Sequence, residues 1–225
     1  WHNTGSAYSL LKANLSGDST IVSYADILYR PIIIDRLNKS NSDITIAYDS
    51  LWKQRYIGRP KNDLTNTEKV IVSKSTLLKT GPEVSVESAD GEFIGLVHFQ
   101  GNAMSFLRDL QNKRDESLEK ISLPDLIELM RLKGLSSSVI DVEGDWAELN
   151  ESKDVAHFIL GTKAETLDRL SNMVSKSVVL DQFSFQVSDW NNDSSNILEK
   201  ISKTFHNTRV VVRSSAKSED AFTQS

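Results

Sequence analysis

The sequence contains no cysteine, which excludes disulfide bonds, thiolate metal sites and cysteine nucleophiles together. No apolar run approaches the roughly 20 residues that cross a bilayer, and the first residues lack the charged and apolar regions of a signal peptide. Basic residues are not in excess, because 26 Lys and Arg stand against 31 Asp and Glu and give a net charge of -5. The sequence therefore predicts a cytoplasmic protein whose main partners are neither nucleic acids nor membranes.

Proline and glycine are scarce and unevenly distributed. All four Pro and nine of the ten Gly precede residue 145, and only Gly161 follows. Residues 161–225 carry eight basic and eight acidic side chains, so the net negative charge resides in residues 1–160. We therefore expect two domains, 1–160 and 161–225. The abrupt start at Trp1 and end at Ser225 favour a piece of a longer protein.

Hydrophobic periodicity alternates between strand and helix in the first part, which predicts an α/β fold with a mostly parallel sheet. The expected strands are 20–24, 44–48, 69–72, 84–86, 93–99, 139–142 and 146–149. The expected helices are 7–14, one beginning at Pro31, 102–110, 123–132 and 151–160. In the second part we expect helices 163–174 and 194–205 and strands 184–187 and 209–212.

Two acidic positions are candidates for cation binding. Asp26 directly follows an apolar strand, at the carboxyl edge where α/β sheets bind ligands. Glu148 belongs to the acidic run 141–150, and strand alternation places it on one face with Trp146 and Asn150. The alternatives are that Asp26 caps a turn and that the run is a solvated edge strand in which Asn150 caps the next helix.

Six segments in order resemble sugar-phosphate-type nucleotidyltransferases, and specifically their choline-phosphate and phosphonate cytidylyltransferase branch. These segments are Gly5–Leu10, Val22–Tyr29, Asp49–Arg59, Thr67–Val70, Gly91–Leu96 and Gly144–Asn150. The resemblance covers roughly residues 1–158 and implies a Rossmann-like mixed sheet flanked by helices, incomplete at its N-terminus.

The resemblance implies Mg²⁺-dependent transfer of a nucleotidyl group from CTP or ATP to a phosphate or phosphonate, with release of pyrophosphate. Asp26, Glu148 and Asn150 match the metal-binding positions, although the family commonly has Asp where this chain has Asn150. Gly5 and Ser6 match a turn that faces the nucleotide. Arg59 suits an anionic acceptor, and its alternative role is that of a surface arginine.

The Gly-rich loop with which this family opens, and which holds the triphosphate, has no match in the sequence. If the chain is a fragment, that loop lies before Trp1, and this part alone is inactive. The rival hypothesis is a non-catalytic scaffold or dimerisation module, for which Ala25 and Asn150 are the signs of lost activity.

Residues 176–225 resemble the start of the ATP-grasp domain of phosphoenolpyruvate synthase and pyruvate phosphate dikinase. The run Val210–Asp220 carries most of this resemblance, which implies that Arg213 binds ATP phosphates. The alternative is an arginine that closes a strand and pairs with Glu219 or Asp220. Together, the two resemblances predict a bifunctional transferase and kinase.

The apolar run Val210–Val212 predicts a strand covered on both faces, which a partial domain cannot provide. We expect an exposed apolar face over residues 176–225. That face buries itself against residues 1–160 or against a second copy in a homo-oligomer, or stays uncovered.

Overall fold

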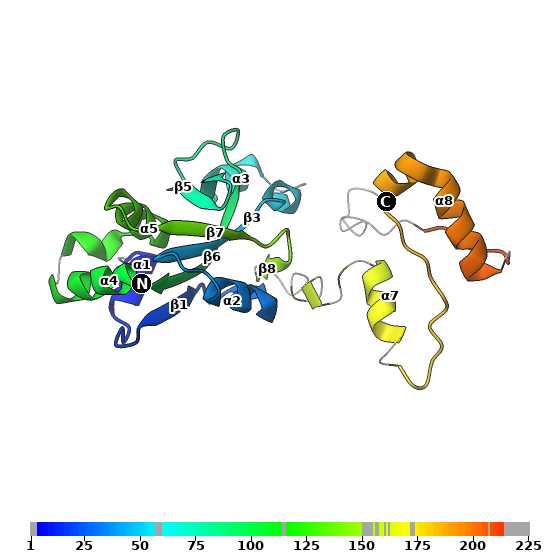
Figure 1. Cartoon of the computed structure of the whole chain (residues 1–225), viewed down its shortest axis with the longest axis horizontal. Coiled ribbons are helices and arrows are strands. Elements are labelled where there is room, and N and C mark those ends of the chain that lie inside the picture. Colours follow the sequence, from blue (N-terminus) through cyan, green and yellow to red (C-terminus); the bar gives the residue numbers. More distant parts are fainter. Residues whose placement is uncertain are drawn as a thin grey trace. The chain divides into compact units, whose positions relative to one another are not determined.

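The computed structural model describes residues 4–56, 60–113, 116–149, 155, 158–159, 161, 163–171, 174–206 and 208–213. It divides the chain into two units, Trp1–Asn150 and Glu151–Ser225, which are described separately (Figure 1). The division falls before the position near Gly161 at which composition suggests a domain boundary.

Unit 1 is built on a six-stranded sheet in the order β1-β6-β3-β7-β5-β4, and β4 also pairs with β6. Only β3 and β7 pair in parallel among the described strands, so the sheet is mixed and the expectation of a mostly parallel sheet is wrong. The strands are β1 Ser19–Ser23, β3 Ile44–Asp49, β4 Lys69–Ser73, β5 Thr76–Gly81, β6 Gly91–Gln100 and β7 Ser137–Asp141.

The central strand β6 explains how the core is organised. Every residue of β6 except Gln100 is buried, as expected for a strand that is paired on both edges and covered on both faces. Alternate residues point to opposite faces, and Phe93 and Val97 join one hydrophobic cluster while Ile94 and Leu96 join another. The sheet therefore separates two apolar layers.

Helices cover these two layers. The first layer includes residues of α1, α4 and α5, and the second includes Ile33 and Leu37 of α2 (Figure 1). The helices of unit 1 are α1 Ser6–Leu11, α2 Pro31–Asn38, α3 Lys61–Asn66, α4 Asn102–Lys113 and α5 Leu123–Leu132, with the 3-10 helices η1 Trp52–Tyr56 and η2 Glu116–Lys120. The expected α/β class, a mixed sheet flanked by helices, is confirmed.

The helix α5 shows why some boundaries could be predicted from sequence. Ser122 accepts a hydrogen bond from the backbone of Asp125, and the Asp125 side chain accepts one from the Ser122 backbone, forming a capping box. Pro124 occupies the first turn, where its missing N–H is tolerated. The helix spans the predicted residues 123–132.

The strand expected at 84–86 is wrong. These residues form a bend and a turn, and the strand of this region is β5, which forms a hairpin with β4 and ends at Gly81. The alternation of apolar and polar residues after Pro82 resembles a strand, but only Val84 of the three is buried, in a bend against the core.

A separate two-stranded ladder positions the acidic residues singled out by the sequence. It consists of β2 Ile27–Tyr29 and β8 Trp146–Glu148, paired antiparallel. The second hydrophobic cluster includes Ile27 and Trp146, which therefore fix this ladder against the sheet.

Unit 2 contains α7 Lys163–Ser171 and α8 Val187–Phe205, and the second is interrupted by a non-helical Asp193. The strands expected at 184–187 and 209–212 are wrong, because these residues form irregular backbone and the first turn of α8. Most of the helix expected at 151–160 lies outside the described residues. None of the described helices is long and apolar enough to span a membrane.

Large apolar side chains of unit 2 are exposed. Val211 and Val212 are 81% and 84% exposed, and Ile197 is the only apolar side chain that is buried in the described part of this unit. Strand propensity alone does not form a strand, since a strand also needs a partner for its backbone hydrogen bonds.

Candidate active site

The ladder of β2 and β8 brings Asp26 and Glu148 to the same edge of unit 1. Ile27 is paired with Glu148, and the backbone N–H of Leu149 donates to the carbonyl oxygen of Asp26 over 2.7 Å. Asp26 is exposed in the turn before β2, and Glu148 is the last residue of β8. The backbones of the two expected metal ligands are therefore neighbours. That one ion bridges their carboxylates stays a prediction.

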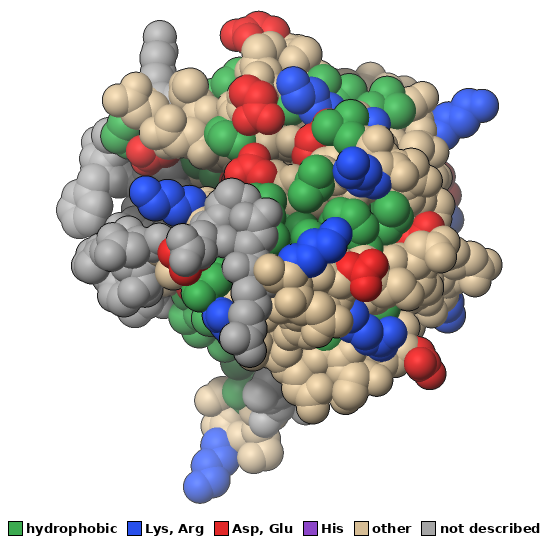
Figure 2. Space-filling view, turned by 90° about the vertical axis from the view of Figure 1, so that its left-hand side faces the viewer, with side chains coloured by type: hydrophobic (Ala, Val, Ile, Leu, Met, Phe, Trp, Pro, Cys, Tyr) green, Lys and Arg blue, Asp and Glu red, His purple; other side chains and the backbone are tan. Residues whose placement is uncertain are grey.

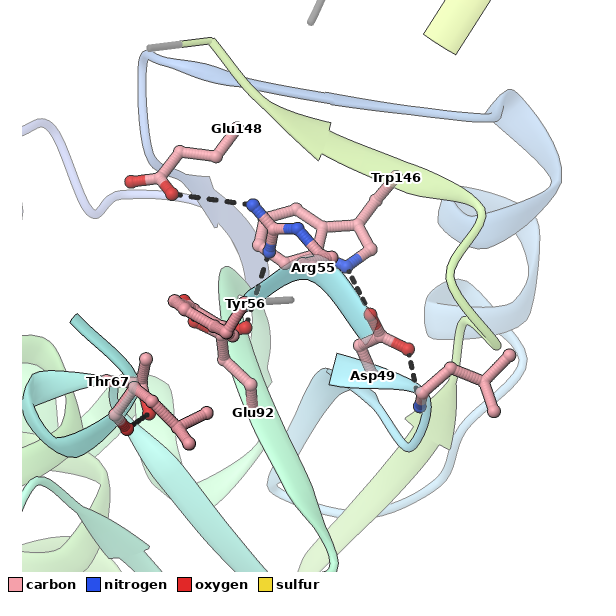
Figure 3. A network of polar contacts seen from close by, with 9 residues as sticks. Asp49, Arg55, Tyr56, Thr67, Glu92, Trp146 and Glu148 are labelled. Atoms are coloured by element: carbon pink, nitrogen blue, oxygen red, sulfur yellow. Dashed lines mark hydrogen bonds and ion pairs between the residues drawn. The ribbon is translucent and has the colours of Figure 1, made fainter. Parts of the chain in front are cut away.

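The carboxylate of Glu148 contacts Arg55, a residue of η1 (Figure 3). Arg55 Nη2 lies 3.4 Å from Glu148 Oε2, and Nη1 lies 3.3 Å from Oε2 of Glu92 on β6. The guanidinium also stacks on Trp146, with its carbon 3.8 Å from the ring centroid. Arg55 thus joins three elements that are far apart in the sequence.

Glu92 is a carboxylate buried in the central strand. The hydroxyl of Tyr56 donates to its Oε1 over 2.6 Å, and Arg55 contacts its Oε2 (Figure 3). Burial raises the pKa of Glu92 to about 7, although Arg55 and the Tyr56 hydrogen bond act in the opposite direction. Tyr56 is buried as well, and its burial, together with the negative charge of Glu92, raises the pKa of Tyr56 above its ordinary value.

Lys69 of β4 lies next to Glu92, because the two residues are paired where β4 runs beside β6. Its ammonium group is buried and donates to the carbonyl oxygens of Thr65 and Thr67 over 2.6 and 2.8 Å. Burial lowers the pKa of Lys69. These bonds connect the end of α3 to the start of β4, which is a structural role.

A second buried carboxylate, Glu68, pairs with Tyr24. The Tyr24 hydroxyl lies 3.1 and 2.9 Å from the two oxygens of Glu68. Burial raises the pKa of Glu68 to about 7, and burial together with Glu68 raises the pKa of Tyr24. The nearby Ser6 side chain acts in the opposite direction on the pKa of Tyr24, so this pair lies near the turn before α1.

The turn at Gly5 and Ser6 has structural partners in unit 1. The backbone N–H of Gly5 donates to Glu119 over 2.7 Å, and the hydroxyl of Ser6 accepts from the backbone N–H of Leu123 over 2.8 Å. These bonds hold α1 beside η2 and α5. Contact of Gly5 and Ser6 with a nucleotide stays a prediction.

The remaining predicted site residues are not brought together by the described structure. Arg59 and Asn150 lie outside the described residues. Arg213 lies in unit 2, exposed in irregular backbone after α8.

Sequence reasoning placed Arg55, Glu68 and Glu92 inside the motifs of the resemblance but gave none of them a role. For Glu92 a signal exists, because a carboxylate stands at the start of a long apolar strand. The contacts of Arg55 are non-local, and no sequence pattern announces them.

This edge could bind a divalent cation only through one or two carboxylates, with water and substrate phosphates as the other ligands. Within the part of the chain that the structure describes, no group of three or more His, Cys, Asp or Glu side chains could hold a metal ion. Mg²⁺ needs fewer protein ligands, because it keeps several waters and binds through one or two carboxylates plus substrate phosphates. Asp26 and the part-exposed Glu148 supply such carboxylates.

On the face drawn in Figure 2, basic and acidic side chains are interspersed with hydrophobic ones. The described side chains on that face form no continuous basic surface of the kind that binds nucleic acid.

Comparison with curated proteins finds a nucleotidyltransferase. The chain is 20% identical over 154 residues to the CTP:phosphoglutamine cytidylyltransferase of Campylobacter jejuni. The match covers 65% of this chain and 61% of that protein. The chain therefore spans about three-fifths of the length of this relative. No protein-family model matches the chain.

One solved structure shows a similar fold, and a second falls just below it in similarity. A protein described as a glucose-1-phosphate thymidylyltransferase from Bacillus anthracis superposes with a TM-score of 0.50 at 8% identity, over 77% of this chain and 64% of that one. The inositol-1-phosphate CTP transferase of T. maritima gives a TM-score of 0.49 at 16% identity, over 79% and 65%. The sequence match supports the resemblance to nucleotidyltransferases, and that relative is not described as an ATP-grasp kinase.

Proposed function

We propose that the chain carries part of a Mg²⁺-dependent nucleotidyltransferase that transfers the cytidylyl group of CTP to a phosphate or phosphonate. The pairing of Ile27 with Glu148 carries this proposal, because it places the backbones of two carboxylate-bearing residues, Asp26 and Glu148, side by side at one edge of unit 1. The sequence likeness to a cytidylyltransferase supports the choice of nucleotide.

In this reaction an oxyanion of the acceptor attacks the α-phosphorus of CTP in line. A new phosphorus–oxygen bond forms as the bond to the leaving pyrophosphate breaks, and pyrophosphate departs with the electron pair. The protein contributes positioning and charge neutralisation rather than covalent chemistry. A bound Mg²⁺ supplies neutralisation of the phosphate charges.

The residues of this chain have distinct proposed roles. Asp26 and Glu148, with Asn150, hold the cation beside the phosphates. Gly5 and Ser6 face the nucleotide, and Arg59 receives the anionic acceptor. A fixed guanidinium suits that last task because its planar fork matches a phosphate oxygen pair.

Calorimetric titration of the complete protein, as its gene encodes it, with CTP, UTP, ATP and GTP tests the nucleotide. We expect CTP to bind at least tenfold more tightly than the others, and only with Mg²⁺ present. Equal binding of all four nucleotides would contradict cytidylyl transfer. Absence of any nucleotide binding would favour the scaffold hypothesis.

A kinase function of residues 176–225 is a separate hypothesis. It rests on the Val210–Asp220 string, and it predicts that Arg213→Ala abolishes ATP binding by the complete protein. The irregular backbone at 208–213 gives it no structural support. Unchanged ATP binding in the variant would remove it.

A further inference from the structure

The two carboxylates that contact Arg55, Glu92 and Glu148, differ in how far they are buried. The side chain of Glu92 is 8% exposed and that of Glu148 is 36% exposed, while Arg55 itself is 17% exposed. Both contacts, at 3.3 and 3.4 Å, are longer than the 2.7–2.9 Å typical of a strong charge-assisted hydrogen bond. The guanidinium is therefore shared between a buried anchor and a contact that solvent can reach.

The buried side of this arrangement is fixed. Tyr56 donates to Glu92, and the ring of Trp146 covers the guanidinium. Trp146 is itself anchored by its indole N–H, which donates to Asp49 over 2.9 Å (Figure 3). Arg55 can lose its contact with Glu148 and still keep an ion pair and an aromatic face.

The contact of Arg55 with the more exposed Glu148 can be replaced by another cation. Glu148 Oε2 contacts Arg55, whereas Oε1 accepts no hydrogen bond from the residues that the structure describes. A partly exposed ion pair with a contact this long contributes little free energy. A divalent ion carries twice the charge of the guanidinium and binds carboxylate oxygens directly.

We propose that Arg55 is an internal competitor for the metal, a cation that occupies Glu148 until a divalent ion displaces it. This inference rests on the proposed function, in which Glu148 is a metal ligand. On displacement, Glu92 and Trp146 retain the guanidinium in the site. Arg55 is thus a residue that sets metal affinity through Glu148, and it need not touch the metal.

The variant Arg55→Lys separates competition from simple repulsion. Lysine preserves the positive charge, but its compact ammonium lacks the planar fork that spans two carboxylates. If Arg55 competes for Glu148, both Arg55→Lys and Arg55→Met tighten metal binding. If only its electric field matters, Arg55→Lys has no effect. Arg30, which pairs with Asp145 beside the same ladder, provides the matched control Arg30→Met.

The test is Mn²⁺ binding by the complete protein, followed at pH 8 through the electron paramagnetic resonance signal of free Mn²⁺. We expect Arg55→Lys and Arg55→Met to bind Mn²⁺ about two- to fivefold more tightly than the wild type, the range set by an exposed ion pair. Arg30→Met should change the affinity less, and Glu148→Gln should weaken it at least tenfold. Thermal unfolding checks that each variant is folded, and Arg55→Lys carries the test if Arg55→Met does not fold.

The possible failures are distinguishable. If Glu148→Gln weakens binding but Arg55→Lys leaves it unchanged or weaker, the competitor hypothesis is wrong while the metal site stands. An equal gain in Arg30→Met also overturns it, since long-range charge would then suffice. If the wild type binds no Mn²⁺, or Glu148→Gln binds as well as the wild type, the proposed metal site itself fails.

Discussion

The indole N–H of Trp146 donates a hydrogen bond to the fully buried carboxylate of Asp49, joining β8 to the end of β3 over 2.9 Å. The other oxygen of Asp49 accepts from the backbone N–H of Leu51 at 2.8 Å. Both oxygens therefore face a donor, and this one side chain ties β8 to the end of β3. Because both of its oxygens are hydrogen-bonded in the core, we expect substitutions of Asp49 to destabilise the protein.

We predict that Asp49→Asn destabilises the protein by about 2–4 kcal/mol. An amide offers one acceptor oxygen and an NH₂ group, so one of the two donors would face another donor and stay unsatisfied in the core. Urea unfolding measures the change in the free energy of unfolding.

The double variant Asp49→Asn with Trp146→Phe is the control for that explanation. Removing the indole N–H leaves the amide oxygen free for Leu51, so the two changes should cost less together than the sum of their single costs. Additive costs would show that the pairing of donor and acceptor does not explain the effect.

A second prediction concerns pH. The pKa of Glu68 is raised from 4.5 to about 7, so the folded state binds this proton more tightly than the unfolded state does. Its contribution to stability is fully present below about pH 4.5 and is lost as pH rises through about 7. Glu68→Gln should therefore remove up to roughly 3 kcal/mol of the fall in unfolding free energy between these pH values.

Denaturant unfolding of both proteins at pH 5, 6, 7 and 8 measures this difference. The exposed Glu87→Gln is the control for the loss of an acidic side chain, and it should retain the wild-type profile. Parallel profiles for wild type and Glu68→Gln would mean that Glu68 titrates alike in the folded and unfolded states.

A third prediction concerns the backbone beside Tyr24. Gly95 has φ +81° inside β6, and a Cβ there would overlap the Tyr24 ring. Gly95→Ala should cost roughly 3 kcal/mol or more, because steric overlap adds to the backbone strain. Thermal unfolding of the variant measures the loss.

The matched control is Gly134→Ala at the end of α5. Gly134 has a similar φ of +88° but open space around its missing Cβ, so only strain of about 1–2 kcal/mol is expected. Equal destabilisation by both variants would show that contact with Tyr24 is not tight.

How much could be predicted from sequence depends on whether the deciding contacts are local. The helix at 123–132 was predicted because Ser122, Asp125 and Pro124 fix its start within one turn. The strand at 209–212 was wrong because the apolar run says nothing about a pairing partner, and the described unit 2 supplies none.

The candidate site shows the same division. Asp26 and Glu148 could be singled out because each is an acidic residue beside an apolar strand. Their proximity could not be predicted, since it depends on the pairing of β8 with β2, a strand that the sequence pattern does not indicate. The contacts of Arg55 with Glu92 and Glu148 span 37 and 93 residues of sequence, so no local pattern encodes them. The family resemblance assigns the anion-binding role to Arg59 instead. Arg59 belongs to the same motif as Arg55 but lies outside the described residues.

The central claim is that Asp26 and Glu148 serve nucleotidyl transfer. Its most direct measurement is Mg²⁺-dependent release of pyrophosphate from CTP by the complete protein, with a panel of phosphorylated and phosphonate acceptors. We expect release that requires both CTP and an acceptor, and a loss of at least a hundredfold in Asp26→Asn and Glu148→Gln, or about 3 kcal/mol of transition-state stabilisation. The exposed Glu143→Gln, in the turn before β8, should retain wild-type activity. Release that persists in Asp26→Asn and Glu148→Gln, or that never depends on CTP, would contradict the account.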